Sequence, residues 1–186
     1  FRHVSDLAEI NRIADLFMSD RGNEQALQLM EAWREGAMAA AAMLEKGIDQ
    51  WDEVYPNLAV LKEDVSNGDL FVLEEDGAIK GMVVLNELQD KEYADVRWRL
   101  TEGKPLVVHR LCVHPDHQGM GVAKRLMAFA ENYALEKGYS SIRLDTFTQN
   151  PTSVALYAKL GYAKAGTVTF RKGVFYCFEK EVTQPE

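Results

Sequence analysis

The chain is poor in cysteine and contains no long apolar run. Only two of its 186 residues are cysteines, Cys112 and Cys177, and each lies in an apolar stretch far from the other. A secreted protein held by disulfides needs a richer framework, so we expect two reduced core thiols and a cytoplasmic location. The longest run of small apolar residues, 37–44, is far shorter than the roughly 20 residues that cross a bilayer, so we expect no membrane anchor.

Basic residues are also in the minority. The 29 acidic side chains outnumber the 21 basic ones, and the formal net charge is -8. Such a chain repels the phosphate backbone of nucleic acid and favours a neutral or cationic partner. Its four histidines and two cysteines show no metal-ligand spacing, so we expect no metal site. Repeats and linker-like segments are absent, and the length suits a single domain over residues 1–186.

Hydrophobic periodicity predicts an α/β fold. The expected helices cover residues 7–17, about 24–46 (ended by Gly47), 122–133 and 151–160. The expected strands cover 1–4, 70–73, 81–85, 106–113, 142–147, 162–170 and 174–182, and the polar stretch 87–104 is a connecting excursion that could carry substrate contacts. Strand 106–113, its helix and strand 142–147 form a βαβ unit, which makes these two strands parallel. We therefore expect a mixed, mostly antiparallel central sheet with helices on both faces and one parallel pair.

The most informative segment is Gln118-Gly119-Met120-Gly121-Val122-Ala123, which lies between a strand and an amphipathic helix. A glycine turn at a helix start presents unpaired backbone N–H groups at the positive end of the helix dipole, and this suits a phosphate or pyrophosphate. The alternative, that the glycines serve only to turn the chain, stays open. No P-loop string occurs, and Lys124 stands where a dinucleotide fingerprint needs a third glycine or alanine.

Three ordered motifs resemble those of the GCN5-related N-acetyltransferases, the GNAT superfamily. Residues 118–123 match the acetyl-CoA motif Gln/Arg-x-x-Gly-x-Gly/Ala of that family, and residues 111–115 are similar to the end of its fourth strand. Asn150, followed by Tyr157, is similar to its second cofactor motif. The resemblance covers nearly the whole chain and is most specific over residues 106–162. It implies that the parallel strands splay apart at the cofactor site.

The implied cofactor is acetyl-CoA, whose pyrophosphate would rest on the amides of the glycine loop. By resemblance, the cofactor-binding residues are Leu111, Cys112, Val113, Gln118, Gly119, Met120, Gly121, Val122, Ala123, Asn150, Ser153 and Tyr157. The Val113 N–H would donate to the thioester carbonyl. The family often has Arg or Lys where His117 and Gln118 stand, so the backbone would carry more of the pyrophosphate binding in this chain.

The resemblance also implies catalytic candidates. Tyr157 matches the general acid that protonates the departing thiolate, although a tyrosine packed between helix and sheet is the alternative. His109 is the candidate base, or else a hydrogen-bonded histidine at a strand edge. Asp145 would orient a cationic amine or a water, unless burial raises its pKa. Trp51, Tyr55 and Trp98 could line the acceptor pocket or belong to the core, and the pocket is expected among the N-terminal helices, residues 49–55 and 87–98, and the last hairpin.

Together these observations favour an acetyl-CoA-dependent N-acetyltransferase in which a primary amine of a small molecule attacks the thioester directly. The acidic composition leans toward a cationic acceptor such as a polyamine or an aminoglycoside. Two alternatives stay open: an acetyltransferase of protein or peptide N-termini, and an acyl-CoA sensor without turnover. We expect no nucleic-acid or membrane partner, and whether the protein forms a homodimer stays open at this stage.

Overall fold

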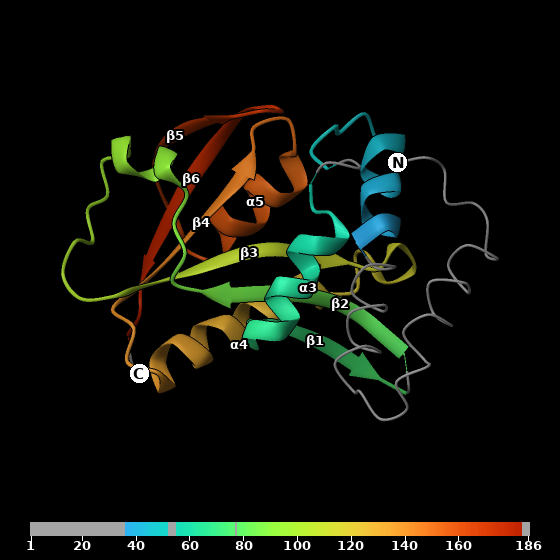
Figure 1. Ribbon diagram of the computed structural model, residues 1–186, viewed down its shortest axis with the longest axis horizontal. Helices are drawn as coiled ribbons and strands as arrows, with labels where there is room; N and C mark the ends of the chain where they lie inside the picture. The colour runs from blue at the N-terminus through green and yellow to red at the C-terminus, as the bar shows by residue number, and fades with distance from the viewer. Residues whose placement is uncertain (1–35, 52–54, 77, 184–186) are drawn as a thin grey trace.

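The computed structural model describes residues 36–51, 55–76 and 78–183 (Figure 1). The strand expected at residues 1–4, the helix expected at 7–17 and the first part of the helix expected from Glu24 lie outside the described residues. The rest of that second helix is present over residues 36–45, and Gly47 ends it with a positive φ of 74°.

A six-stranded sheet runs through the protein in the order β1-β2-β3-β4-β6-β5. The strands are β1 (Leu70–Glu75), β2 (Ala78–Asn86), β3 (Pro105–Val113), β4 (Ser141–Phe147), β5 (Ala163–Phe170) and β6 (Gly173–Glu181). All neighbouring pairs are antiparallel except β3 and β4, which are parallel. The predicted mixed sheet with one parallel pair is therefore confirmed.

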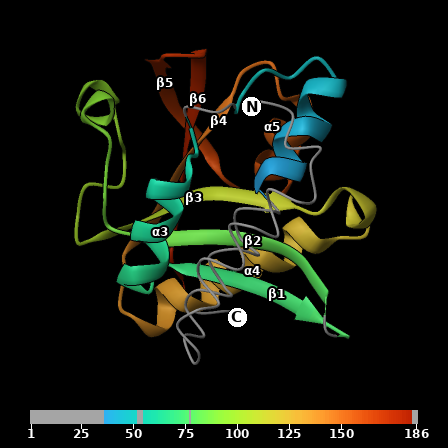
Figure 2. The same ribbon diagram turned by 45° about the vertical axis from the view of Figure 1, so that its right-hand side comes forward.

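Helices cover both faces of this sheet (Figures 1 and 2). On one face, α4 (Val122–Glu136) and α5 (Pro151–Lys159) pack over the central strands, and their buried residues join those of the sheet in one core cluster. Leu126, Met127, Ala130 and Ala134 form the buried stripe of α4, at the spacing of an amphipathic helix. On the other face, the helix over residues 36–45 and α3 (Leu58–Asn67) share a second cluster with Met82 and Cys112.

The helix α3 was not predicted from the sequence. Its start carries a clear local signal, because the Asn57 side chain accepts a hydrogen bond from the Val60 N–H at 3.0 Å. Gly68 ends it in the left-handed conformation, with φ 73°. The helix was not predicted because it has only ten residues and so offers little periodicity.

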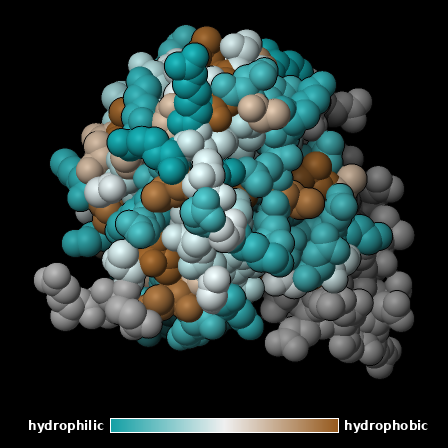
Figure 3. Space-filling view, turned by 90° about the vertical axis from the view of Figure 1, so that its left-hand side faces the viewer, coloured by the Kyte–Doolittle hydropathy of each residue, from teal (hydrophilic) through white to brown (hydrophobic). Residues whose placement is uncertain are grey.

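The excursion between β2 and β3 is irregular, as predicted, apart from the short 3-10 helix η1 (Lys91–Asp95). Tyr93 and Val96 of this segment are buried against Phe147 and Phe175 in a third core cluster, on the face opposite α4. The side of the molecule that carries the segment is mostly hydrophilic, with small scattered apolar patches (Figure 3).

Candidate active site

The parallel strands β3 and β4 pair for only part of their length. Their register runs from Pro105 opposite Ser141 to Val108 opposite Leu144, and beyond this point β3 stays paired only with β2, and β4 only with β6. A cavity of about 630 Å³ opens where the strands part. It is lined by the ends of both strands, the glycine loop before α4, the start of α5 and the helix over residues 36–45. The expected splay is thus present.

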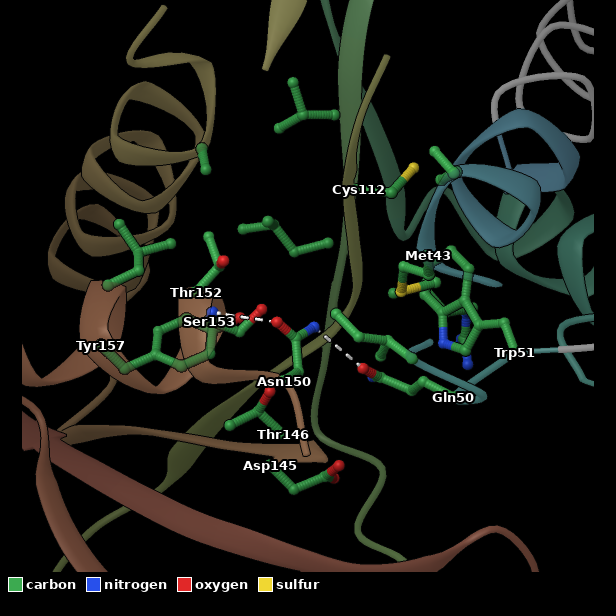
Figure 4. Close-up of a pocket in the computed structure, with 18 of the residues that line it drawn as sticks. Met43, Gln50, Trp51, Cys112, Asp145, Thr146, Asn150, Thr152, Ser153 and Tyr157 are labelled. Carbon is green, nitrogen blue, oxygen red and sulfur yellow. Dashed lines mark hydrogen bonds between the residues drawn. The ribbon is translucent and has the colours of Figure 1, made fainter. Parts of the chain in front are cut away.

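A β-bulge shapes the β3 side of the cavity. The register with β2 shifts between Met82 and Val84, and Arg110 on β3 adopts a left-handed φ of 49°. After the bulge, Leu111 and Val113 face the α4 core, whereas Cys112 points to the helix over residues 36–45 (Figure 4). All three predicted residues, 111–113, line the cavity.

The glycine loop lies at one end of the cavity. Gly119 and Gly121 have φ of 78° and 81°, so both need glycine for their conformation, and a Cβ added at either would enter open space. Gly121 is the N-cap of α4, so the first-turn amides from Val122 onward have no partner within the helix. The predicted residues of this loop line the cavity except Met120, whose side chain is 69% exposed and lies outside the lining.

Lys46 adds a positive charge that the sequence analysis missed. It follows the helix over residues 36–45, and its Nζ donates to Gln118 Oε1 at 2.6 Å. Among the described residues, the cationic side chains that line the cavity are Lys46, Arg110, Lys124, Arg171 and Lys172. The backbone of the loop is therefore not alone in favouring an anion. How much of the pyrophosphate binding the backbone carries stays a prediction.

Asn150 links two walls of the cavity (Figure 4). Its Oδ1 accepts from the Ser153 N–H at 3.2 Å and so caps α5, as predicted, while its Nδ2 donates to Gln50 Oε1 at 3.2 Å. Asn150, Ser153 and Gln50 all line the cavity. The role of Gln50 was not predicted, because it lies 100 positions from Asn150 in the sequence.

Tyr157 lies in the α5 wall of the cavity, opposite Trp51 (Figure 4). It is only 6% exposed, and its ring packs against those of Tyr162 and Phe178. Burial raises the pKa of Tyr157 well above its usual range, and the charge of Asp145 acts in the same direction. The phenol is therefore protonated near neutral pH, and its role as a proton donor stays a prediction.

His109 lines the cavity in its neutral form. Its Nε2 lies 3.0 Å from the carbonyl oxygen of Leu88, and a carbonyl only accepts, so Nε2 carries the ring proton and Nδ1 is left as the acceptor. Burial, helped by the charge of Arg110, lowers the pKa of His109 to about 4, although the Leu88 contact opposes this.

Asp145 faces the same cavity from β4. Its Oδ2 accepts a hydrogen bond from the Tyr93 hydroxyl at 2.7 Å, a partner that the sequence analysis missed. Burial raises the pKa of Asp145 to about 6; the Tyr93 bond lowers this pKa, and the nearby charge of Asp90 raises it. His109 and Asp145 thus line the same cavity, and their catalytic roles remain predictions.

The three aromatic candidates divide between cavity and core. Trp51 and Tyr55 line the cavity, and the Tyr55 hydroxyl accepts from Arg110 Nη1 at 2.7 Å. Trp98 does not line it. Its ring lies under the Arg143 guanidinium at 4.4 Å, and its centroid is 5.2 Å from that of Tyr93. Trp98 therefore supports the segment over residues 87–104 and is not part of the cavity wall.

The described part of the chain contains no group of three or more His, Cys, Asp or Glu side chains arranged to hold a metal ion. None of its helices is both long enough and apolar enough to cross a membrane.

Comparison with known proteins identifies the family. A family model described as the acetyltransferase (GNAT) family matches residues 27–162, which is well over half of the chain. The chain belongs to this GNAT family. The solved structure of a GNAT family acetyltransferase from Streptococcus agalactiae superposes with a TM-score of 0.68, at 22% identity, and covers 96% of this chain and 92% of that one.

Two further relatives are informative. Streptothricin acetyltransferase of Escherichia coli is 33% identical over 97 residues, which cover 52% of this GNAT chain and 53% of that protein. The structure of yncA from Salmonella typhimurium with its cofactor acetyl-CoA has the same fold, with a TM-score of 0.58 at 19% identity over 89% of this chain and 94% of that one. The chain spans only about half the length of the curated relatives it matches, between 41% and 53% for the first three.

Proposed function

We propose that this GNAT chain is an acetyl-CoA-dependent N-acetyltransferase, in which a primary amine of a small cationic molecule attacks the thioester directly. The observation that carries the proposal is the single cavity of about 630 Å³ in the β3–β4 splay. It joins the glycine loop, which suits a pyrophosphate, to Tyr157, His109 and Asp145, which can move protons. Family membership supplies the independent support.

The residues at the loop end fit coenzyme A. First-turn amides of α4, the open space beside Gly119 and Gly121, and the ammonium groups of Lys46 and Lys124 all favour a phosphate-bearing ligand. Residues 111–113 of β3, together with Asn150 and Ser153, would hold the pantetheine arm along the splay. When bound, acetyl-CoA supplies the activated acyl group, and the yncA structure with acetyl-CoA supports the same assignment.

Proton transfer is assigned to the groups at the other end. The Tyr157 phenol, kept protonated by burial, would donate to the thiolate that leaves. Asp145 would bind the acceptor as an ammonium ion and accept its proton, because burial brings its pKa to about 6, close to the operating range of a general base. His109 Nδ1 is the second candidate, but its pKa of about 4 makes it the weaker base.

The charges at the end of the cavity near Asp145 favour a cationic acceptor. Asp90 and Asp145 both line the cavity, while the charges of Arg110 and Lys172 are offset by their ion pairs with Asp64 and Asp49. A relative named streptothricin acetyltransferase supports a small-molecule acceptor. Cationic small molecules of this kind are therefore the first acceptors to test.

The decisive experiment measures free thiol release from acetyl-CoA with a panel of amines: polyamines, aminoglycosides, streptothricin and peptides. We expect release above background with cationic small molecules, and an Asp145→Asn variant should lose most of it. Faster release with peptides would favour the N-terminal acetyltransferase alternative. Coenzyme A binding with no release from any amine would favour the sensor.

Cofactor binding has its own matched test. Gly121→Val and Gly138→Val place the same side chain at positive φ in open space, at the start and just after the end of α4. Only Gly121 lies at the cavity. We expect Gly121→Val to lose coenzyme A binding in calorimetry and Gly138→Val to keep it. Equal affinity of the two variants would refute the assignment of the loop.

A further inference from the structure

We propose that Tyr93 is a positioning residue for the acceptor site: its hydroxyl holds one carboxylate oxygen of Asp145 and leaves the other for the acceptor amine. The inference rests on the proposed function in one respect, since it takes Asp145 as the group that meets the acceptor. Tyr93 itself is 2% exposed and does not line the cavity, so it acts through Asp145.

The geometry at the carboxylate is specific. The Tyr93 hydroxyl donates to Asp145 Oδ2 at 2.7 Å, and among the residues that the structure describes Oδ1 has no hydrogen-bond partner. Asp145 is only partly buried and lines the cavity, as Figure 4 shows. The protein therefore fixes Oδ2, and this bond orients the carboxylate plane. Oδ1 is then held in a defined direction for binding the acceptor amine.

Tyr93 is in turn anchored through Trp98. The Trp98 Nε1–H donates to the Tyr93 carbonyl oxygen at 3.0 Å, and the Arg143 guanidinium lies over the Trp98 ring at 4.4 Å. Arg143 also donates to the side chain of Gln89 at 2.6 Å and to the carbonyl of Leu100 at 2.9 Å. Both ends of the segment that carries Tyr93 are thus tied to β4, the strand that carries Asp145.

Several other groups surround Asp145, and they do not replace this bond. Asp90 raises the pKa of Asp145 by its charge, and the charge of Asp145 in turn raises the pKa values of Tyr55, Tyr157 and Cys177. His109 and Arg110 share the cavity from β3. Because the Tyr93 bond stabilises the ionised carboxylate, removing it should raise the pKa of Asp145.

The first test is a Tyr93→Phe variant measured without any acceptor. Carbon-13 NMR of the aspartate side-chain carboxyls, with Asp145→Asn used to assign the signal, gives the Asp145 pKa directly. We expect an increase of about one pH unit in Tyr93→Phe. Tyr139→Phe is the matched control, because the Tyr139 hydroxyl donates to Glu87 Oε1 at 3.1 Å outside the cavity. It should leave the Asp145 signal unchanged.

The second test uses turnover. The acid limb of kcat/KM should move to higher pH by the same amount in Tyr93→Phe, and Tyr93→Phe should add little to the loss already caused by Asp145→Asn. Trp98→Phe removes the anchor but keeps the Tyr93 hydroxyl, so it should move the Asp145 pKa upward by less. If Tyr93→Phe does not fold, Trp98→Phe provides the test in its place.

An unchanged Asp145 titration in the folded variants would overturn the proposal, and so would a fall in kcat with no movement of the pH profile. The NMR result needs no acceptor and no turnover. A failure of the proposed function therefore appears as absent thiol release in the wild type, whereas a failure of this inference appears as an unmoved carboxyl signal.

Discussion

At the scale of single residues, one physical cause acts on all three candidate catalytic groups. Burial raises the pKa values of Tyr157 and Asp145 and lowers that of His109 to about 4, so each group is shifted toward its neutral form. The same desolvation should lower the pKa of the acceptor's ammonium ion once Asp145 has bound it in the cavity. The site should therefore assist the loss of a proton from the amine, which is what a nucleophilic amine requires.

Replacing Tyr157 by Phe tests the proposed acid. We expect kcat to fall by about two orders of magnitude, the scale of a lost general acid, with little change in coenzyme A affinity. Steady-state kinetics and calorimetry measure the two effects. Tyr162→Phe is the control, because the two rings lie 6.0 Å apart in the same core but Tyr162 is not in the cavity lining. If kcat falls by a similar factor in both variants, the effect comes from core packing and Tyr157 is not the general acid.

At the scale of elements, the sequence predicted those with strong periodicity or strong turn signals. The strands β3 and β4, the helix α4 between them and the cap of α5 at Asn150 lie close to their predicted places. The segment 87–104 was assigned no structure beyond an excursion, because its order comes from distant partners. Glu179 on β6 is 1% exposed and accepts from the N–H groups of Arg99 and Leu100 at 2.9 and 3.1 Å.

Glu179→Gln tests whether this segment forms the acceptor wall. A Gln amide places a donor against backbone donors, so we expect a loss of about 2–4 kcal/mol in unfolding free energy and a higher KM for the acceptor. Coenzyme A affinity should stay the same. Denaturant unfolding, hydrogen exchange at residues 99 and 100, and kinetics measure these effects.

Glu131→Gln is the control for this variant. Glu131 pairs with Lys180 at 2.8 Å, and its side chain is 31% exposed, so its loss should cost under about 1 kcal/mol. If Glu179→Gln lowers the free energy of unfolding but leaves KM for the acceptor unchanged, the segment 87–104 does not contribute to acceptor binding.

At the scale of the whole molecule, the site was predictable where its residues are close in sequence. The motif around residues 118–123 and the pair Asn150 and Tyr157 carry local signals, whereas Lys46, Gln50 and Tyr93 reach the site only through tertiary contacts. Lys46, for example, lies 72 positions from its partner Gln118. Neither the periodicity nor the residue spacing within one element predicts a contact of this kind.

The same contacts resolve a conflict in the overall charge. A net charge of -8 opposes an anionic cofactor, yet within the described residues five cationic side chains and only two acidic ones, Asp90 and Asp145, line the cavity. Two of the five cations, Arg110 and Lys172, are paired with Asp64 and Asp49, so Lys46 and Lys124 are the main positive charges beside the glycine loop. Because screening limits exposed charges to a range of about 8–10 Å at physiological salt, the nearby cations should outweigh the distant acidic surface. The local field, and not the net charge, should then control cofactor affinity.

This argument predicts that salt weakens coenzyme A binding. If local cations dominate, affinity should fall as ionic strength rises from about 0.05 to about 0.5 M, whereas dominant repulsion by the acidic surface would make it rise. Lys46→Gln should weaken binding about two- to fivefold at low salt and hardly at all at high salt, because an exposed charge is easily screened. Lys137→Gln, at the far end of α4 and outside the cavity lining, should have no such effect. Calorimetric titrations of coenzyme A at both salt concentrations measure these effects. If Lys46→Gln lowers the affinity equally at both concentrations, Lys46 acts by packing or by ordering Gln118 and not by its charge.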